Sequence, residues 1–479
     1  MTLPCEVESP ADVINEPEGG LVAWMQGQDW RQFTSKVGMP GNRDGGGVTI
    51  DYVKVTGDDE VGPKGSMVFV PGQSEASSKH DEQIYALVQA GYSPVYAIDH
   101  RGQGRSGREL EEPLKGHVQE GGDFIVDFTD FINLVVEDLA EIEAEKLFLT
   151  CHSMGCAITF GYCMREYKAQ RPQYFHAIAA FAPLVQPNTS PFPYDVAVAI
   201  GWTMDQMGIG EDWAPTLEKT FDEAYAESNY LHATTTSYTR WSRAKDNCVR
   251  NKDVVFHDGM PDEHTGICQS GVTANFAKEL FTWYDQFNDF LDEFDELKYG
   301  LQVPILLQQA GSDDTVINEP QNEFCEKGAL DCTLSVYPDS EHNIWTEVDS
   351  IRTPAIEEAL AFFDANSEIL LAQAPLPPVE TCGWSWWTWK CFVEFWPRLG
   401  AFLGFGTVSA AAGIFVLRKQ KMDGKKHAAM KSNEMGEFNR KESGANSPFS
   451  AASDADLLKE LQRRGLSTSS ALAGKGSML

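Results

Sequence analysis

The chain has 479 residues, 42% of them hydrophobic, and a formal net charge of −33 at pH 7. This length allows one large domain with insertions or two ordinary domains, and the apolar content supports a sizeable packed core. From Arg418 onward there are 12 Lys and Arg against 7 Asp and Glu, a net charge of +5, which leaves −38 on the rest. A body this acidic excludes nucleic-acid binding through phosphate contacts.

Residues 1–47 are interpreted as an N-terminal extension. The first twenty contain neither Lys nor Arg and no apolar run, so they lack the pattern of a secretory signal. From Val48 onward, short apolar runs alternate with helical patterns. Strands are predicted at "VTIDYVKVTG", "SMVFVPG", "SPVYAID", "KLFLT", "HAIAAFAPLV", "VPILLQQAG" and "CTLSVYP", and helices at "DEQIYALVQAG" and "FIVDFTDFINLVVEDLAEIE". Such alternation indicates an α/β fold, with a mainly parallel sheet covered by helices on both faces.

The strand pattern is interrupted within residues 187–299. This stretch is rich in aromatic and acidic residues and has helical segments such as "FTWYDQFNDFLDEFDEL". The strand pattern resumes at Val303. We therefore predict a helical cap insertion at residues 187–299, between a first core half at residues 48–186 and a second at residues 300–370.

The C-terminal part has the pattern of a membrane anchor. Residues 371–398 combine a Pro-rich linker with a Trp-rich juxtamembrane segment, and residues 399–417 contain no charge. These nineteen residues would span ~28 Å as a helix, close to the hydrocarbon thickness of a bilayer. Tryptophans on one flank and lysines on the other favour a single transmembrane helix, followed by a basic, largely disordered tail at residues 418–479. Gly400 and Gly404 would allow homodimerisation through this helix.

The side of the membrane that carries the catalytic body is left open. Five Lys and Arg between Arg418 and Lys426 favour a cytosolic tail. A cytosolic tail would place the catalytic body on the far side of the membrane, yet no N-terminal signal is visible to translocate that body. Either the true start lies upstream, or the protein inserts late as a tail-anchored protein with its body in the cytosol.

The cysteines and potential ligand motifs indicate no cofactor and no metal. No CxxC, HExxH or Gly-rich phosphate-loop pattern is present. Three cysteines fall in an expected buried strand and helix and are interpreted as free thiols: Cys151, Cys156 and Cys163. Two pairs are close enough in sequence to be bridged: Cys325 with Cys332, and Cys382 with Cys391.

The segment "LTCHSMGC" places Ser153 between an apolar strand and a helix. A sharp strand-to-helix turn exposes a nucleophile beside backbone N–H groups, and it needs small residues two positions before and after the serine. Gly155 meets this need, and Cys151 stands where glycine is usual. We therefore interpret Ser153 as a nucleophile.

A serine nucleophile needs a base and an orienting carboxylate. His342 follows the strand "LSVYP", and Asp313 and Asp314 follow the strand "ILLQQA". The pattern alone does not separate the two aspartates, and Asp99 at an earlier strand end is a weaker alternative.

Other polar residues near these motifs receive structural interpretations. We expect His152 to pack or hydrogen-bond locally, and His100 and Arg101 to fix the loop after a strand. His117 and His264 are interpreted as loop histidines, with substrate contact as the alternative.

The segments "VPGQSEASSKHDEQIYALVQAGYSPVYAIDHRGQGRSGR", "GHV", "HSMG" and "SEHN" resemble the branch of the α/β-hydrolases that contains monoacylglycerol lipases and lysophospholipases. The resemblance implies a catalytic triad of Ser153, Asp314 and His342. It also implies that the oxyanion is bound by the backbone N–H groups of Gln73 and Met154. The implied substrate is a single-chain lipid ester, either a lysophospholipid or a monoacylglycerol. The alternatives are a serine hydrolase of non-lipid esters or peptides, and a catalytically inactive binding module.

Overall fold

The structure is a computed structural model that describes residues 12–39, 42–112, 114–169, 171, 173–215, 234–250, 269, 271–297 and 301–368. All of these lie within the unit Met1–Val379. The predicted anchor at 399–417, its flanks, the Cys382–Cys391 pair and His264 lie outside the described residues. Among the described helices, none is both long and apolar enough to cross a bilayer.

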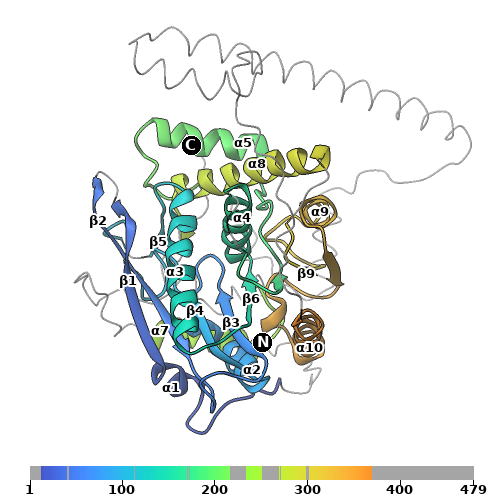
Figure 1. Ribbon diagram of the computed structural model, residues 1–479. Coiled ribbons are helices and arrows are strands. Elements are labelled where there is room, and N and C mark those ends of the chain that lie inside the picture. The colour runs from blue at the N-terminus through green and yellow to red at the C-terminus, as the bar shows by residue number, and fades with distance from the viewer. Residues whose placement is uncertain are drawn as a thin grey trace, which may run out of the picture. The chain divides into compact units, whose positions relative to one another are not determined.

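An eight-stranded sheet organises the described residues (Figure 1). Its strands, in spatial order, are β1 (Asp29–Met39), β2 (Asn42–Val55), β4 (Tyr92–Ile98), β3 (Gly65–Val70), β6 (Leu147–His152), β7 (Ile178–Phe181), β9 (Ile305–Ala310) and β10 (Cys332–Tyr337). The β1–β2 and β2–β4 pairs are antiparallel, and every later pair is parallel. The predicted mainly parallel sheet is therefore confirmed.

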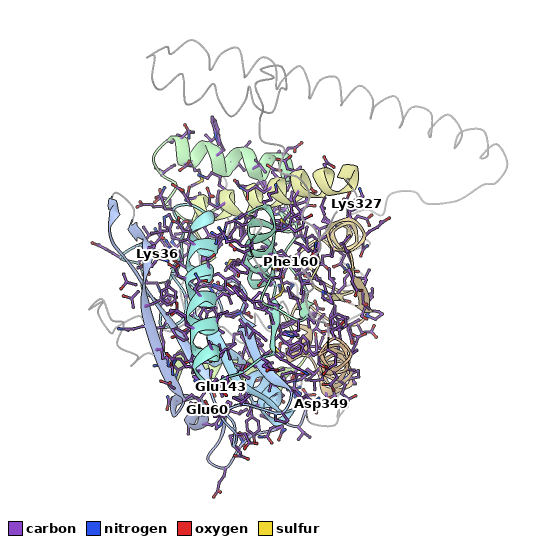
Figure 2. The ribbon with its side chains drawn as sticks, in the orientation of Figure 1. Lys36, Glu60, Glu143, Phe160, Lys327 and Asp349 are labelled. Carbon is purple, nitrogen blue, oxygen red and sulfur yellow. A yellow bond between two sulfur atoms is a disulfide. The ribbon has the colours of Figure 1, made fainter. Side chains whose placement is uncertain are left out.

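The sheet is covered on both faces. Side chains of β3 alternate between two apolar clusters, with Val68 and Val70 in one and Met67 and Phe69 in the other. The first cluster includes residues of helices α3 (Gly122–Glu141) and α4 (Met154–Lys168), and the second includes residues of α2 (Asp81–Gln89) and α10 (Asp349–Ala365). Figure 2 shows the fully buried Phe160 of α4 in the interior, with Glu60 and Lys327 at the periphery.

The sheet begins earlier than the sequence analysis places it. Strand β1 lies within the residues interpreted as an N-terminal extension, and it pairs with β2 along the sheet edge. It carries charges such as Arg31 and Lys36, because an edge strand has one side open to solvent. Because of this mixed composition, β1 contains no continuous apolar run that would predict a strand. A short helix, α1 (Leu21–Gln26), precedes it.

The described residues between β7 and β9 form two parts. Helices α5 (Tyr194–Gln206) and α8 (Ala274–Leu297) pack side by side, and Lys278 of α8 pairs with Asp205 of α5 at 3.0 Å. A two-residue strand, β8 (Gly271–Val272), pairs with β5 (Lys115–Gly116) of the core. Helix α7 (Tyr238–Arg250) instead lies beside α2, where Arg240 forms two hydrogen bonds with Glu82, at 2.9 and 3.0 Å. Of the described helices in the insertion, α5 and α8 therefore lie where they can cover a site at the strand ends.

After β9, the chain forms a short helix, α9 (Asn318–Glu323), and returns through β10 to α10. A disulfide joins Cys325 to Cys332 at the start of β10. One of the two disulfide pairs expected from sequence spacing is thus present among the described residues.

Candidate active site

Ser153 stands at the turn between β6 and α4. Its φ of 47° and ψ of −118° place a residue with a Cβ in the left-handed region. This conformation is the sharp strand-to-helix turn that the sequence predicts, and it leaves the side chain facing a cavity that Ser153 lines.

The residues that flank the turn explain how it closes. A Cβ at Gly155 would come within 2.4 Å of the carbonyl oxygens of Val70 and Pro71, so only glycine fits this position. On the other side, Cys151 forms a disulfide with Cys156 of α4. The interpretation of these two cysteines as free thiols is therefore wrong, because the side chains of the strand and the helix meet behind the turn. Cys163 is a free, buried thiol, as expected.

His342 lies directly beside the serine. The Ser153 hydroxyl donates to His342 Nε2 at 2.9 Å, and His342 Nδ1 donates to Asp313 Oδ2 at 2.7 Å. The imidazole is thus held between an acceptor carboxylate and the nucleophile, as a general base must be.

The prediction of Asp314 as the orienting carboxylate is wrong by one residue. The Asp314 residue is exposed, and its carboxylate has Thr315 Oγ1 as a neighbour at 3.5 Å. The Asp313 side chain is fully buried, and its Oδ1 accepts the backbone N–H groups of Thr315 and Val316 at 2.8 and 3.0 Å. These two bonds turn Asp313 inward and leave Asp314 facing solvent.

The environment of Asp313 keeps it ionised. Burial by itself raises the pKa of its carboxyl group, but the hydrogen bonds from His342, Val316 and Thr315 outweigh burial and lower that pKa below its usual value. An ionised carboxylate at this place would stabilise an imidazolium if His342 accepted a proton.

Gln73 and Met154 both line the cavity next to Ser153. Their backbone N–H groups donate to no other residue that the structure describes. Met154 begins α4, so its N–H is one of the unpaired donors of a helix N-terminus. Two unoccupied donors beside a nucleophile are what oxyanion binding requires.

A buried carboxylate, Glu75, lies behind these groups. Its Oε2 accepts the Gly72 N–H at 2.6 Å, His152 Nδ1 at 2.8 Å and His80 Nε2 at 2.9 Å, and its Oε1 accepts Lys79 Nζ at 2.8 Å. Burial opposes ionisation, but the cationic and imidazole partners outweigh it and lower the pKa of Glu75 well below its usual value. His152 therefore hydrogen-bonds locally, as expected.

The same cluster has the residue types of a metal site. Ligand atoms of Glu75, His80 and His152 lie within 4.8 Å of one another. Each histidine already donates to the carboxylate, and the Lys79 ammonium occupies its other oxygen. Hydrogen bonding thus accounts for the arrangement, and burial lowers the pKa of His152 to about 4, which keeps its ring neutral.

Several further residues have structural roles. Arg101 is fully buried and holds Asp127 of α3 at 2.7 and 2.9 Å. Asp99 accepts hydrogen bonds from Ser77 and the Arg105 backbone, so it does not serve His342. His117 is buried and bonded to Thr273, at 2.9 Å, and is therefore not a solvated loop histidine.

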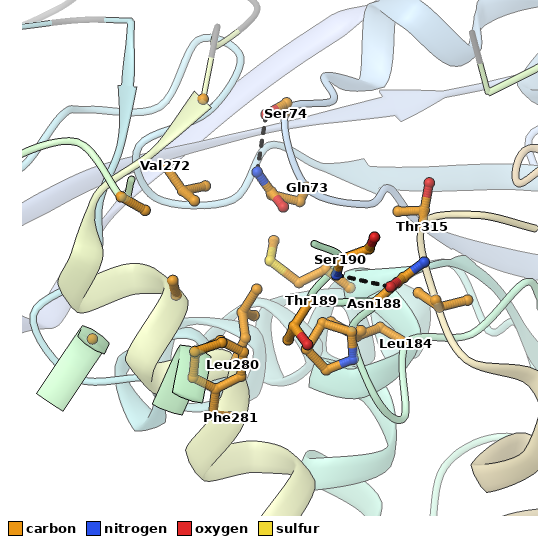
Figure 3. A pocket seen from close by; sticks show the side chains of 18 of the residues that line it. Gln73, Ser74, Leu184, Asn188, Thr189, Ser190, Val272, Leu280, Phe281 and Thr315 are labelled. Carbon is orange, nitrogen blue, oxygen red and sulfur yellow. Dashed lines mark hydrogen bonds between the residues drawn. The ribbon is translucent and has the colours of Figure 1, made fainter. Parts of the chain in front are cut away.

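The cavity beside Ser153 has a volume of about 560 Å³. Its wall combines strand-end residues with the apolar side of α5 and α8, including Leu184, Phe192, Ile200, Leu280, Phe281 and Val316. Figure 3 shows Gln73 and Ser74 on one side of this cavity, opposite Leu280 and Phe281. None of the described residues that line it carries a charge. The cavity therefore suits an apolar, uncharged chain next to the nucleophile.

The sequence of this chain is similar to those of known hydrolases. The sequence model of the family described as "Serine aminopeptidase, S33" matches residues 62–349. Lysophospholipase L2 of Escherichia coli (strain K12) is 36% identical over 307 residues, which cover 63% of this chain and 81% of that protein. The monoacylglycerol lipase of Mycolicibacterium smegmatis is 31% identical over 154 residues, 32% of this chain and 49% of that protein.

Among solved structures, a soluble variant of monoglyceride lipase from Saccharomyces cerevisiae, in complex with a substrate analog, has a similar fold. Its TM-score is 0.52 at 13% sequence identity, over 76% of this chain and 99% of that chain.

Proposed function

The chain belongs to the "Serine aminopeptidase, S33" family, in the α/β-hydrolase branch of lysophospholipases and monoacylglycerol lipases, and from that premise we propose that it cleaves single-chain lipid esters. It is an ester hydrolase of the serine type. The observation that carries the substrate proposal is the uncharged, mostly apolar cavity of about 560 Å³ at Ser153.

The proposed reaction follows from the contacts of the triad. His342 removes the proton of the Ser153 hydroxyl as the oxygen attacks the ester carbonyl, and Asp313 stabilises the resulting imidazolium. The carbonyl oxygen takes up negative charge and is bound by the N–H groups of Gln73 and Met154. The imidazolium then protonates the leaving alcohol. His342 next activates a water molecule, which attacks the acyl-enzyme and releases the fatty acid.

The cavity favours a lipid over a peptide substrate. An aminopeptidase must hold a free ammonium group, and a buried charge requires a charged or strongly polar partner. The described lining residues include amides and hydroxyls but no carboxylate. An acyl chain needs only the apolar wall, and a polar head group would remain outside it.

The proposal includes attachment to a bilayer. It is supported by the uncharged residues 399–417 with their Trp and Lys flanks, and by exposed apolar side chains on and after α5. Val196, Trp202 and Met207 are 44%, 59% and 69% exposed. A single-pass anchor would keep the active site at high effective concentration relative to lipids that partition into the membrane. Pairing of two chains through Gly400 and Gly404 is proposed separately, because small residues four positions apart would let two helices approach closely.

A substrate panel tests the proposal. Purified protein is assayed for fatty-acid release from lysophosphatidylcholine, from monoacylglycerol and from a dissolved short-chain ester, and for cleavage of an aminoacyl peptide. Ser153→Ala is the control. We expect both long-chain lipids to be cleaved with a higher kcat/KM than the short ester, and the peptide not to be cleaved. Preferred cleavage of the peptide would contradict the substrate class. No labelling of Ser153 by a fluorophosphonate would contradict the mechanism.

Attachment is tested separately with a chain that ends at Pro378. This chain should keep its rate on the dissolved ester and lose much of its rate on lysolipid in vesicles. A second membrane tether should restore the latter. Equal rates of both chains on vesicles would contradict the proposed role of the anchor, and protease protection in sealed vesicles would show which side carries the catalytic body.

A further inference from the structure

The loop of residues 71–75 presses against the nucleophile. A Cβ at Gly72 would lie 3.1 Å from the Cβ of Ser153 and 3.0 Å from His152 Nδ1. This contact leaves the backbone of the loop as the wall of the site next to the serine. The direction of each peptide group in the loop therefore decides whether a donor or an acceptor faces the reacting carbonyl.

Gln103, from the loop after β4, binds this backbone with both ends of its side-chain amide. Its Nε2 donates to the carbonyl of Gly72 at 2.9 Å and to that of Glu75 at 3.2 Å. Its Oε1 accepts the backbone N–H of Ser74 at 2.8 Å. Gln103 itself is 1% exposed, so solvent does not compete for these bonds.

These contacts fix the two peptide groups that flank the Cα of Gln73. The Gly72 carbonyl and the Gln73 N–H belong to one planar trans peptide, in which the C=O and N–H bonds point in opposite directions. A donor that holds the carbonyl on one side therefore aims the N–H to the other side. The next peptide is held in the same way through the Ser74 N–H.

We infer that Gln103 is a positioning residue that directs the Gln73 N–H toward the oxyanion, an inference that rests on the proposed acyl-enzyme mechanism. The other described hydrogen bonds to the loop backbone lie at its start, and the Ser74 side chain contacts Gln269 at 3.4 Å. His100 donates to the Pro71 carbonyl at 3.0 Å, and Glu75 accepts the Gly72 N–H. Among the described hydrogen bonds, Gln103 alone binds the Gly72 carbonyl and the Ser74 N–H.

Glutamine is suited to this place because it combines a donor and an acceptor in one rigid plane. Methionine has a similar length and neither group. Glutamate keeps an acceptor for Ser74 but turns a carboxylate oxygen toward the two carbonyls. Both Gln103→Met and Gln103→Glu should therefore remove the hydrogen bond that orients the Gly72–Gln73 peptide group beside the nucleophile.

The test compares these variants with a matched control, Gln321→Met. Gln321 is also fully buried, donates to one backbone carbonyl (Pro183, 3.0 Å) and accepts one hydrogen bond, from Gln309 at 3.1 Å, but it lies outside the loop. The readouts are kcat and KM on a dissolved short-chain ester, and the affinity for a trifluoromethyl ketone. Ser153 adds to that ketone and forms a tetrahedral oxyanion, which the N–H groups bind.

We expect Gln103→Met to lower kcat about 10–100-fold, less than outright loss of an oxyanion donor, with KM changed less than about threefold. The affinity for the ketone should fall by the same factor as kcat. Gln321→Met should change neither. If Gln103→Met does not fold, Gln103→Glu provides the same comparison.

A loss of kcat without a matching loss of ketone affinity would overturn the inference, and so would an equal effect of Gln321→Met. Failure of the wild-type protein to bind the ketone would instead contradict the proposed mechanism, so the two failures are distinguishable.

Discussion

The loops at the carboxyl ends of the strands and the helical insertion above them meet at one cavity but are built differently. Ser153 and His342 are 7% and 3% exposed. They are hydrogen-bonded to each other, and His342 is also hydrogen-bonded to Asp313. The α5 and α8 residues that line the cavity contribute mainly apolar contact, and several are only half-buried. Under the proposed function, the residues at the strand ends would break the ester bond, whereas the insertion would select the acyl chain.

The largest loss of activity is expected from substitutions at the strand ends. Ser153→Ala or His342→Ala should lower kcat about 10⁶-fold on every ester, because both groups act in one step. The measurement is kcat on a dissolved short-chain ester and on a long-chain lipid. A loss confined to the long-chain substrate would mean that these residues belong to chain recognition instead.

The two adjacent aspartates should differ strongly in their effect on kcat. Asp313→Asn should lower kcat about 10⁴-fold, because an amide cannot hold His342 in the required tautomer. Asp314→Asn should change kcat less than about threefold, since its side chain is exposed. A larger loss for Asp314→Asn would show that the one-residue correction at this strand end is mistaken.

The insertion should respond in a different way. Ala277→Phe introduces a ring into the cavity from α8 and should reduce kcat/KM for a long acyl chain about tenfold, with little change for a short ester. Gln286→Phe is the control, on the exposed side of the same helix. Equal losses on long and short esters would contradict the division between bond cleavage and chain selection.

The smallest effect concerns the disulfide behind the nucleophile. Replacing Cys151 and Cys156 together by alanine should lower the free energy of unfolding by about 2 kcal/mol. Because this disulfide ties β6 to α4 on either side of Ser153, kcat should also fall a few-fold. The control is the double replacement of Cys325 and Cys332, which should lower stability by a similar amount and leave kcat unchanged. An unchanged kcat after replacement of Cys151 and Cys156 would contradict a role of this disulfide in supporting the turn.

Most strands and the order of the triad were predictable, because parallel strands that are buried on both faces leave continuous apolar runs. The strand β1 was not, since its exposed edge permits charged side chains such as Arg31 and Lys36. The choice between Asp313 and Asp314 depends on which carboxylate accepts the Thr315 and Val316 N–H groups, and a linear sequence does not contain that orientation.

The role of Gln103 could not be predicted from the sequence, for a related reason. Its partners lie about thirty positions earlier in the chain and are backbone groups, which have no side-chain identity to recognise in a sequence. The Cys151–Cys156 bond had a usable signal, namely a cysteine in place of the usual glycine, five positions before another cysteine. The spacing alone did not show that the two side chains turn toward each other.

The backbone at Ser153 places reactivity and stability in opposition. A φ of 47° costs a residue with a Cβ on the order of 1–3 kcal/mol, whereas glycine adopts it readily. The position that the chemistry reserves for serine is therefore one where folding would favour glycine. Ser153→Ala removes the nucleophile but keeps the unfavourable backbone, and Ser153→Gly removes both. The glycine variant should consequently be the more robust inactive form, and the better choice for trapping an uncleaved substrate in the cavity.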